Sequence, residues 1–142
     1  MHAIDDLRVH SAREPGPRTG GEFVLYWLQT AMRTAGNHAL NFAAEQANSL
    51  GLPLFVYQGL RPDYPWASDR IHSFILESAA DLATDFRDRG IQYVFYLDPG
   101  KEARRPGAPS PLITLAERAA LSALRQRKRS RDENDAIQVA VL

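Results

Sequence analysis

The chain of 142 residues contains no cysteine. Disulfide bonds, thiolate nucleophiles and cysteine-ligated zinc sites are therefore excluded, and a reducing location such as the cytoplasm is expected. No stretch approaches the roughly 20 consecutive apolar residues that a membrane span needs. Residues 1–21 also have no apolar core of signal-peptide length, so no membrane partner is expected.

An excess of either charge is also absent. Lysine and arginine together number 17, aspartate and glutamate number 17, and the formal net charge at pH 7 is zero. No field of the whole chain therefore attracts it to nucleic acid or to a membrane. The cations are almost all arginine, since lysine occurs only at Lys101 and Lys128.

The motifs of several common site types are missing. The chain has neither GxxxxGK[ST] nor GxGxxG, which disfavours a conventional nucleotide site. No two of its histidines, His2, His10, His38 and His72, have metal-ligand spacing. No Ser/His/Asp set can be assembled from the sequence, so no catalytic residue and no metal are predicted. His38 fits a hydrogen-bonding residue at a helix start better than a ligand contact.

What is present is an alternation of short apolar runs and amphipathic segments. After a flexible leader (1–21), apolar runs of strand length occupy residues 23–28, 53–57 and 91–97, and helical periodicity spans residues 37–50 and 68–89. Asn37 and Ser68 are suitable N-caps, and Gly51 and Gly90 are suitable helix stops. The order predicts a β-α-β-α-β unit with right-handed crossovers. The expected fold is an α/β three-layer arrangement: a Rossmann-like parallel sheet with flanking helices.

The signal weakens after Leu97. Residues 98–111 hold four prolines and two glycines and predict a loop, residues 112–124 look helical, and residues 136–142 fit either a last strand or a frayed end. We therefore expect one α/β domain over residues 22–121 and an irregular, arginine-rich tail over 122–142. The cluster Arg125–Arg131 is followed by Asp132, Glu133 and Asp135, which favours a solvated tail over a nucleic-acid patch.

A ligand site is expected at the carboxyl ends of the strands, where open parallel sheets bind ligands. Those ends lie near Leu28, Tyr57 and Leu97. Trp27, Tyr57 and Tyr96 could offer flat aromatic faces to a planar ligand there, although strand aromatics are more often simply core.

Several stretches together resemble class II cyclobutane pyrimidine dimer photolyases. Residues 23–29 (FVLYWLQ) are similar to the family's VLYWMQ strand, Arg33 stands in the following loop, and residues 37–40 (NHAL) match its helix start. Residues 47–54 (ANSLGLPL) and 60–65 (LRPDYP) resemble the next two family segments. The resemblance continues through Arg70, Phe74, Leu76, Glu77 and residues 89–91 and covers about residues 22–97.

The resemblance implies an N-terminal photolyase/cryptochrome α/β domain able to hold an antenna pigment, a deazaflavin or a folate. In the family, a larger helical domain holds FAD, binds UV-damaged DNA, flips out the pyrimidine dimer and splits it with light. By the resemblance, the positions near the antenna crevice are Trp27, Gln29, Arg33, Asn37 and Tyr57. No FAD-binding or DNA-binding residue of the family carries over.

The chain departs from the family pattern because no counterpart of the helical FAD domain follows. We therefore expect a truncated photolyase, with a shift of reading frame after about Leu121 as one hypothesis, and no repair by this chain alone. A cryptochrome-like signalling module, a generic nucleotide-binding α/β domain and a truncated product without function are the alternatives. Repair and signalling share the fold, and the missing glycine-rich motifs argue against the generic nucleotide domain.

Overall fold

The computed structural model describes residues 9–11, 17–100, 103, 105–126 and 136–140. The elements in chain order are β1 (Val9–Ser11), β2 (Phe23–Trp27), α1 (His38–Leu50), β3 (Leu54–Leu60), α2 (Asp69–Asp88), β4 (Gln92–Leu97), α3 (Pro111–Arg118), β5 (Ala119–Gln126) and β6 (Ala136–Ala140). The predicted alternation of strands and helices is confirmed from β2 to β4.

The strands form one sheet in the order β1-β6-β5-β2-β3-β4. Strands β5, β2, β3 and β4 are parallel, so the predicted parallel sheet is confirmed for these four. Strand β6 runs antiparallel to β5, and β1 runs parallel to β6. The last strand that residues 136–142 suggested is present as β6, whereas residues 141 and 142 lie outside the described part. Strand β1 falls within the segment expected to be a flexible leader.

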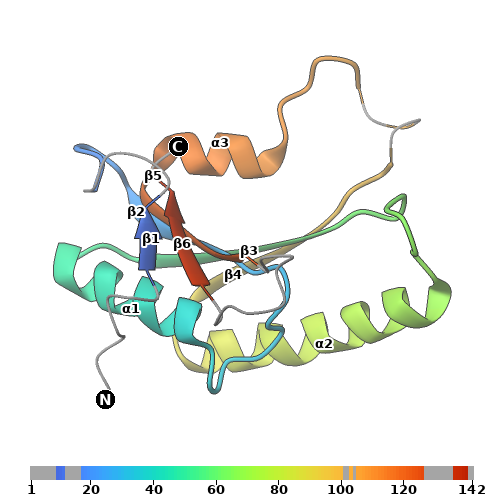
Figure 1. Ribbon diagram of the computed structural model, residues 1–142, viewed down its shortest axis with the longest axis horizontal. Coiled ribbons are helices and arrows are strands. Elements are labelled where there is room, and N and C mark those ends of the chain that lie inside the picture. Colours follow the sequence, from blue (N-terminus) through green and yellow to red (C-terminus); the bar gives the residue numbers. More distant parts are fainter. Residues whose placement is uncertain (1–8, 12–16, 101–102, 104, 127–135, 141–142) are drawn as a thin grey trace.

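Helices cover both faces of the sheet and give the predicted three layers (Figure 1). We call the face against α1 and α2 the closed face; its core includes Tyr26, Val56 and Phe86. We call the face against α3 the open face; its smaller core includes Leu25 and Tyr57. Alternate residues of β2 and β3 point to opposite faces, as in any strand.

Both long helices have the predicted N-caps, and α1 ends at the predicted Gly51, whereas the C-cap of α2 is Arg89 and the predicted Gly90 follows it with φ of 68°. The Asn37 side chain accepts a hydrogen bond from the Leu40 amide at the start of α1, and Gly51 ends that helix with φ of 64°. The Ser68 side chain accepts from the Ile71 amide at the start of α2. A left-handed backbone at Gly51 is the conformation for which glycine carries no steric penalty.

The predicted helix over residues 112–124 is wrong beyond Arg118. Helix α3 ends there, and Ala119 is already extended, with φ of −74° and ψ of 143°. Ala119 and the residues after it pair with β2. Alanine favours helices in isolation, but this propensity is weak beside the gain from sheet pairing and burial. Residue 121, where the α/β domain was expected to end, therefore lies inside β5.

Candidate functional site

The five residues expected near a crevice lie on or after β2 and β3. Trp27 is the last residue of β2, whereas Tyr57 lies in the middle of β3. The sheet separates them. Trp27 and Tyr57 belong to the open-face core. Asn37 follows the loop after β2 and contacts the closed-face residue Tyr26. The structure thus brings together two of the five side chains and places Asn37 on the other side of the sheet.

Asn37 is fully buried, and its amide is fully used. Its Nδ2 donates to the Tyr26 hydroxyl at 3.0 Å, to the Ala31 carbonyl at 3.2 Å and to the Arg33 carbonyl at 3.1 Å. Its Oδ1 accepts from the Leu40 amide at 3.1 Å. A buried amide with this many partners fixes the loop and the helix start. These bonds leave no obvious donor for a ligand.

Gln29 and Arg33 lie exposed in the loop between β2 and α1. The Arg33 guanidinium donates to the carbonyl of Gly36 at 3.2 Å, within the same loop. The loop is also tied to α2, since the Thr34 hydroxyl donates to Asp85 Oδ2 at 2.9 Å. Gln29 and Arg33 are therefore available at the rim of the carboxyl edge rather than within either core.

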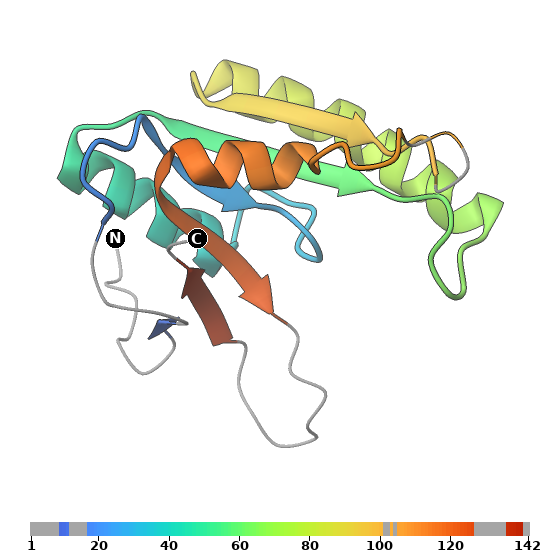
Figure 2. The same cartoon turned by 90° about the horizontal axis from the view of Figure 1, so that it is seen from above.

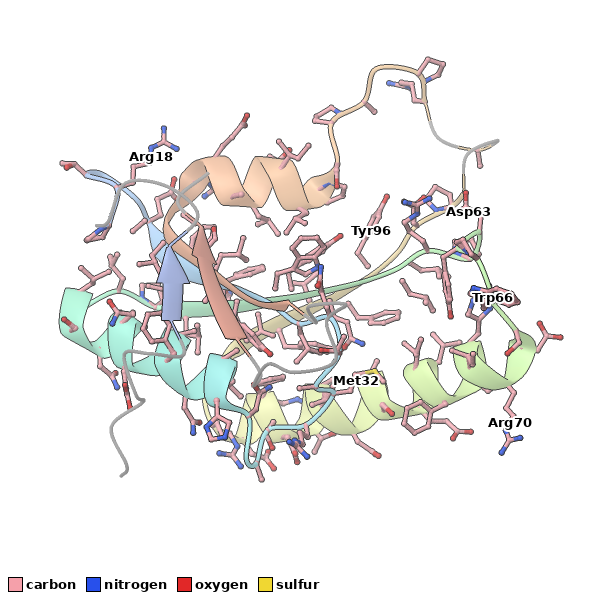
Figure 3. The ribbon with its side chains drawn as sticks, in the orientation of Figure 1. Arg18, Met32, Asp63, Trp66, Arg70 and Tyr96 are labelled. Atoms are coloured by element: carbon pink, nitrogen blue, oxygen red, sulfur yellow. The ribbon has the colours of Figure 1, made fainter. Side chains whose placement is uncertain are left out.

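Trp27 and Tyr57 are neighbours on the open face because their Cα atoms are register partners on β2 and β3. Tyr57 is 5% exposed, and its ring stacks on that of Tyr96, with centroids 6.5 Å apart and an angle of 26°. Figure 3 shows the Tyr96 side chain rising from the sheet on the side where α3 lies. We call Trp27, Tyr57 and Tyr96 the aromatic row; Trp27 and Tyr96 are only half-buried.

Two further residues shape this site, and the sequence did not single them out. Gly59 lies next to the Tyr57 ring, because a Cβ built at Gly59 would stand 3.0 Å from the Tyr57 hydroxyl oxygen. Asp98 is 9% exposed, and its Oδ1 accepts from the Gly100 amide at 2.9 Å. A correct strand register would have pointed to Gly59, because Gly59 is the register partner of Tyr96. Asp98 could have been found as the first residue after β4.

Burial, then the neighbouring Tyr96 and Asp98, raises the pKa of the Tyr57 phenol above its ordinary value. The hydroxyl therefore keeps its proton and can act as a hydrogen-bond donor throughout the physiological range. Flat rings and a phenol donor can bind a planar, partly polar ligand by stacking and hydrogen bonding.

Other candidate chemistry finds little support in the described part of the chain. No group of three or more His, Asp or Glu side chains there is arranged to hold a metal ion. None of the helices described is both long and apolar enough to cross a membrane. His38 is exposed at the first position of α1, and residues 127–131 of the arginine cluster lie outside the described residues.

Comparison with known proteins gives two matches. The DNA photolyase family matches residues 24–139. A curated protein of Methanothermobacter thermautotrophicus, named deoxyribodipyrimidine photo-lyase, is 39% identical over 120 residues. The match covers 84% of this chain and 24% of that protein, so the chain spans about a quarter of the length of its relative.

Proposed function

Because the chain belongs to the DNA photolyase family, we propose that its α/β domain is the antenna-side domain of a class II photolyase. The observation that carries this proposal is the aromatic row on the open face, where β2 and β4 approach their carboxyl ends and Tyr57 lies between them in the middle of β3. That is where parallel sheets bind planar ligands. The proposed role is to hold a pigment that collects light for repair elsewhere in the protein.

The class II assignment has support from two sequence stretches that carry the resemblance. Residues 23–29 contain Tyr26, and residues 37–40 begin with Asn37; the two side chains are hydrogen-bonded at 3.0 Å. This hydrogen bond joins the strand to the helix start, which explains why the two sequence stretches would occur together. By this interpretation Asn37 positions the loop that carries Arg33, and it does not itself contact a pigment.

The open face offers the groups that a deazaflavin or a folate would need. Trp27 and Tyr96 are half-buried, so each has ring surface left for stacking. The Tyr57 hydroxyl would donate to a ring carbonyl or nitrogen of the pigment, and Gln29 and Arg33 at the rim would bind its polar or anionic end. Such a pigment, when bound, supplies absorption of light and transfer of the excitation energy.

Repair itself is proposed for the whole protein, of which these residues form one part. Light-driven splitting of a cyclobutane dimer in UV-damaged DNA needs FAD and a flipped-out dimer. Three quarters of the matched relative have no counterpart in these 142 residues. We expect the polypeptide of 142 residues, purified alone, to show no flavin absorption band and no dimer splitting in light. Bound FAD together with repair would overturn this expectation.

Pigment binding can be tested by tryptophan fluorescence, because the chain has only two tryptophans. Trp66 is 91% exposed in the turn before α2, whereas the aromatic row lies on β2, β3 and β4. Figure 3 shows Trp66 near the start of α2 and Tyr96 on the sheet. The variant Trp66→Phe leaves Trp27 as the sole reporter. Titration of this variant with a deazaflavin or a folate should quench its emission in a saturable manner.

The matched control is Trp27→Phe, which keeps only the distant Trp66 and should show little saturable quenching. Tyr57→Ala in the Trp66→Phe background should weaken binding by at least tenfold, since it removes both stacking and the phenol donor. Absence of saturable quenching with either pigment would argue against the antenna role while leaving family membership intact.

A further inference from the structure

Three large apolar side chains are exposed at the start of α2 and in the turn before it. Trp66 is 91% exposed, Ile71 is 42% exposed and Phe74 is 60% exposed. Figure 2 shows that this end of α2 projects beyond the tips of the strands, at the carboxyl edge of the sheet. Apolar residues exposed singly are common, but a group of three at one end of a helix is typical of a surface that binds another element.

Trp66 is also held in an unfavourable backbone conformation. Its φ is 69°, and among the described residues it is the one non-glycine residue with a positive φ. The Ala67 amide donates to the Tyr64 carbonyl at 3.1 Å, so that Pro65 and Trp66 form the middle of a tight turn. Such turns favour glycine at the position of Trp66. A tryptophan that is both strained and exposed indicates an interaction outside this domain.

The exposed side of α2 beyond Phe74 is acidic. Seven residues make nearly two helical turns, so Phe74, Asp81 and Asp88 lie within about 40° of one line along the helix. All three are exposed, and so is Glu77 beside them. We call this side of the helix the α2 flank; it consists of Ile71, Phe74, Glu77, Asp81 and Asp88. Its apolar residues lie in the first turns and its acidic residues in the later turns.

The α2 flank faces outward from the domain. The core side of α2 carries Leu82 and Phe86. Asp85 lies between the core side and the flank, and it accepts the hydrogen bond from Thr34 in the loop after β2. At 3.6 residues per turn, Asp81 and Asp88 point further from the core than Asp85 does. The flank is therefore open to another element along the line from Phe74 to Asp88.

Charge selects the class of partner for this surface. With Asp85 included, four carboxylates lie on this side of α2, and one cation, Arg70, stands near its start. Such a surface repels the phosphates of nucleic acid and of anionic membranes. Two copies of the flank would also repel each other. A protein helix with apolar side chains at one end and Lys or Arg along the same side matches both parts of the surface.

We propose that Trp66 and the α2 flank bind an amphipathic helix with a basic side, supplied by the part of a photolyase that these 142 residues do not include. A helix packed side by side with α2, at a crossing angle of about 20°, can follow the line from Phe74 to Asp88, which is about 21 Å long. Its apolar side chains cover Trp66, Ile71 and Phe74. Its basic side chains lie opposite Asp81 and Asp88, about seven and fourteen residues further along.

The source of the helix rests on the proposed function. Three quarters of the matched relative lie outside the match, so a photolyase of that length has ample sequence to supply it. A pigment passes its excitation energy on only over a short distance. The part of the protein that uses the light must therefore lie near the pigment, at the carboxyl edge of the sheet. The start of α2 lies at the same edge (Figure 2).

The test uses labelled synthetic peptides of about 25 residues, long enough to span the flank, that together cover the unmatched part of the relative. Binding to the 142-residue chain is measured by fluorescence anisotropy. We expect saturable binding by a peptide with the basic amphipathic pattern and at least tenfold weaker binding by its scrambled version. In the Trp27→Phe variant the same peptide should shift the emission of Trp66 to shorter wavelength, because the indole ring leaves water.

The apolar half of the surface is tested at Phe74. Phe74→Ser should weaken peptide binding by at least tenfold, because it removes the aromatic contact at the centre of the surface. Ile113→Ser is the matched control, since Ile113 is 52% exposed but lies on α3, and it should bind the peptide as the wild type does. Circular dichroism and a cooperative melt would show that both variants remain folded.

The acidic half is tested by charge reversal. Asp81→Lys combined with Asp88→Lys should weaken binding by at least tenfold, and added salt should weaken binding to the wild type. A peptide whose basic residues are changed to Glu should prefer the double variant. Glu117→Lys, at an exposed position of α3, should have little effect.

Four results would each overturn the proposal: no peptide binds saturably, an acidic or scrambled peptide binds as tightly as the basic one, Phe74→Ser has no effect, or the double charge reversal has none. Pigment binding is measured separately, by quenching of Trp27 in the Trp66→Phe variant. A chain that binds pigment but no peptide lacks the helix site and keeps the antenna role, whereas the reverse result removes the antenna role alone.

Discussion

The two faces of the sheet differ in how completely helices cover them. On the closed face, Val24, Tyr26, Val56 and Phe86 are fully buried under α1 and α2. On the open face, α3 has only 8 residues, Trp27 and Tyr96 are half-buried, and Val94 is exposed. The same strands build both faces. We therefore expect the closed face to determine stability and the open face to determine ligand binding.

The largest expected effect is on the closed face at Phe86. Phe86 is fully buried and stacks on Tyr93, so Phe86→Ala leaves a cavity that α2 and β4 cannot easily close. We expect the free energy of unfolding to fall by about 3–5 kcal/mol, measured by urea denaturation. Ile113→Ala on α3, which is mostly exposed, should cost about 0.5 kcal/mol or less. Equal losses would show that the two faces contribute alike to stability.

The next effect concerns Asn37, which joins β2, the following loop and α1. Asn37→Ala removes the helix cap and leaves the Tyr26 hydroxyl and two loop carbonyls without this partner. We expect a loss of about 2–3 kcal/mol in unfolding free energy. His38→Ala, at the exposed neighbouring position, is the control and should change stability little. If Asn37→Ala instead left stability unchanged and abolished pigment binding, Asn37 would belong to the crevice after all.

A smaller effect on stability, but a clear one on binding, is expected at Gly59. The added methyl of Gly59→Ala would meet the Tyr57 hydroxyl at 3.0 Å, and the Tyr57 ring must move. The expected cost in unfolding free energy is about 1 kcal/mol, whereas pigment affinity in the Trp66→Phe background should fall severalfold. Tyr57→Phe separates the steric effect of the methyl group from the loss of the hydrogen-bond donor, because it removes the hydroxyl without crowding the ring. Unchanged affinity in both variants would place the pigment elsewhere.

The strands and helices from β2 to β4 could be predicted from the sequence because the residues that mark their ends act locally. Asn37, Gly51 and Ser68 mark helix ends by side chain and backbone chemistry within one turn. Ala119 carries no such signal. Its extended conformation depends on pairing with Phe23, almost a hundred residues earlier in the chain, so local sequence could not show that the helix ends before it.

The candidate site was only partly predictable for a related reason. Trp27 and Tyr57 are direct register partners on neighbouring strands. The apolar runs predicted where β2 and β4 end, whereas β3 continues three residues beyond Tyr57 to Leu60. Asn37 follows the end of β2, yet the loop turns it toward the closed face, where it bonds Tyr26. Which side of a sheet a loop residue reaches depends on the path of the loop, and residue types alone do not determine that path.

The last prediction compares two phenols with raised pKa values, one on each face, by alkaline titration. Burial raises the pKa of Tyr93 on the closed face to about 12, and its hydroxyl donates to Gln58 Oε1 at 2.8 Å. An unfolded tyrosine titrates near pH 10. Below pH 10 both states hold the proton, so this contribution to stability is fully present. Above it the unfolded chain ionises first, and stability is lost as the pH rises toward 12.

Tyr93→Phe should remove a step near pH 12 from the tyrosinate absorbance curve and reduce the loss of stability between pH 10 and 12. Tyr57→Phe, which removes the other phenol with a raised pKa, should leave the step that belongs to Tyr93 in place. Urea denaturation at pH 9 and pH 11 measures the difference directly. If Tyr93 ionised near pH 10, as an unfolded tyrosine does, the closed face would be open to water, and its contrast with the face under α3 would disappear.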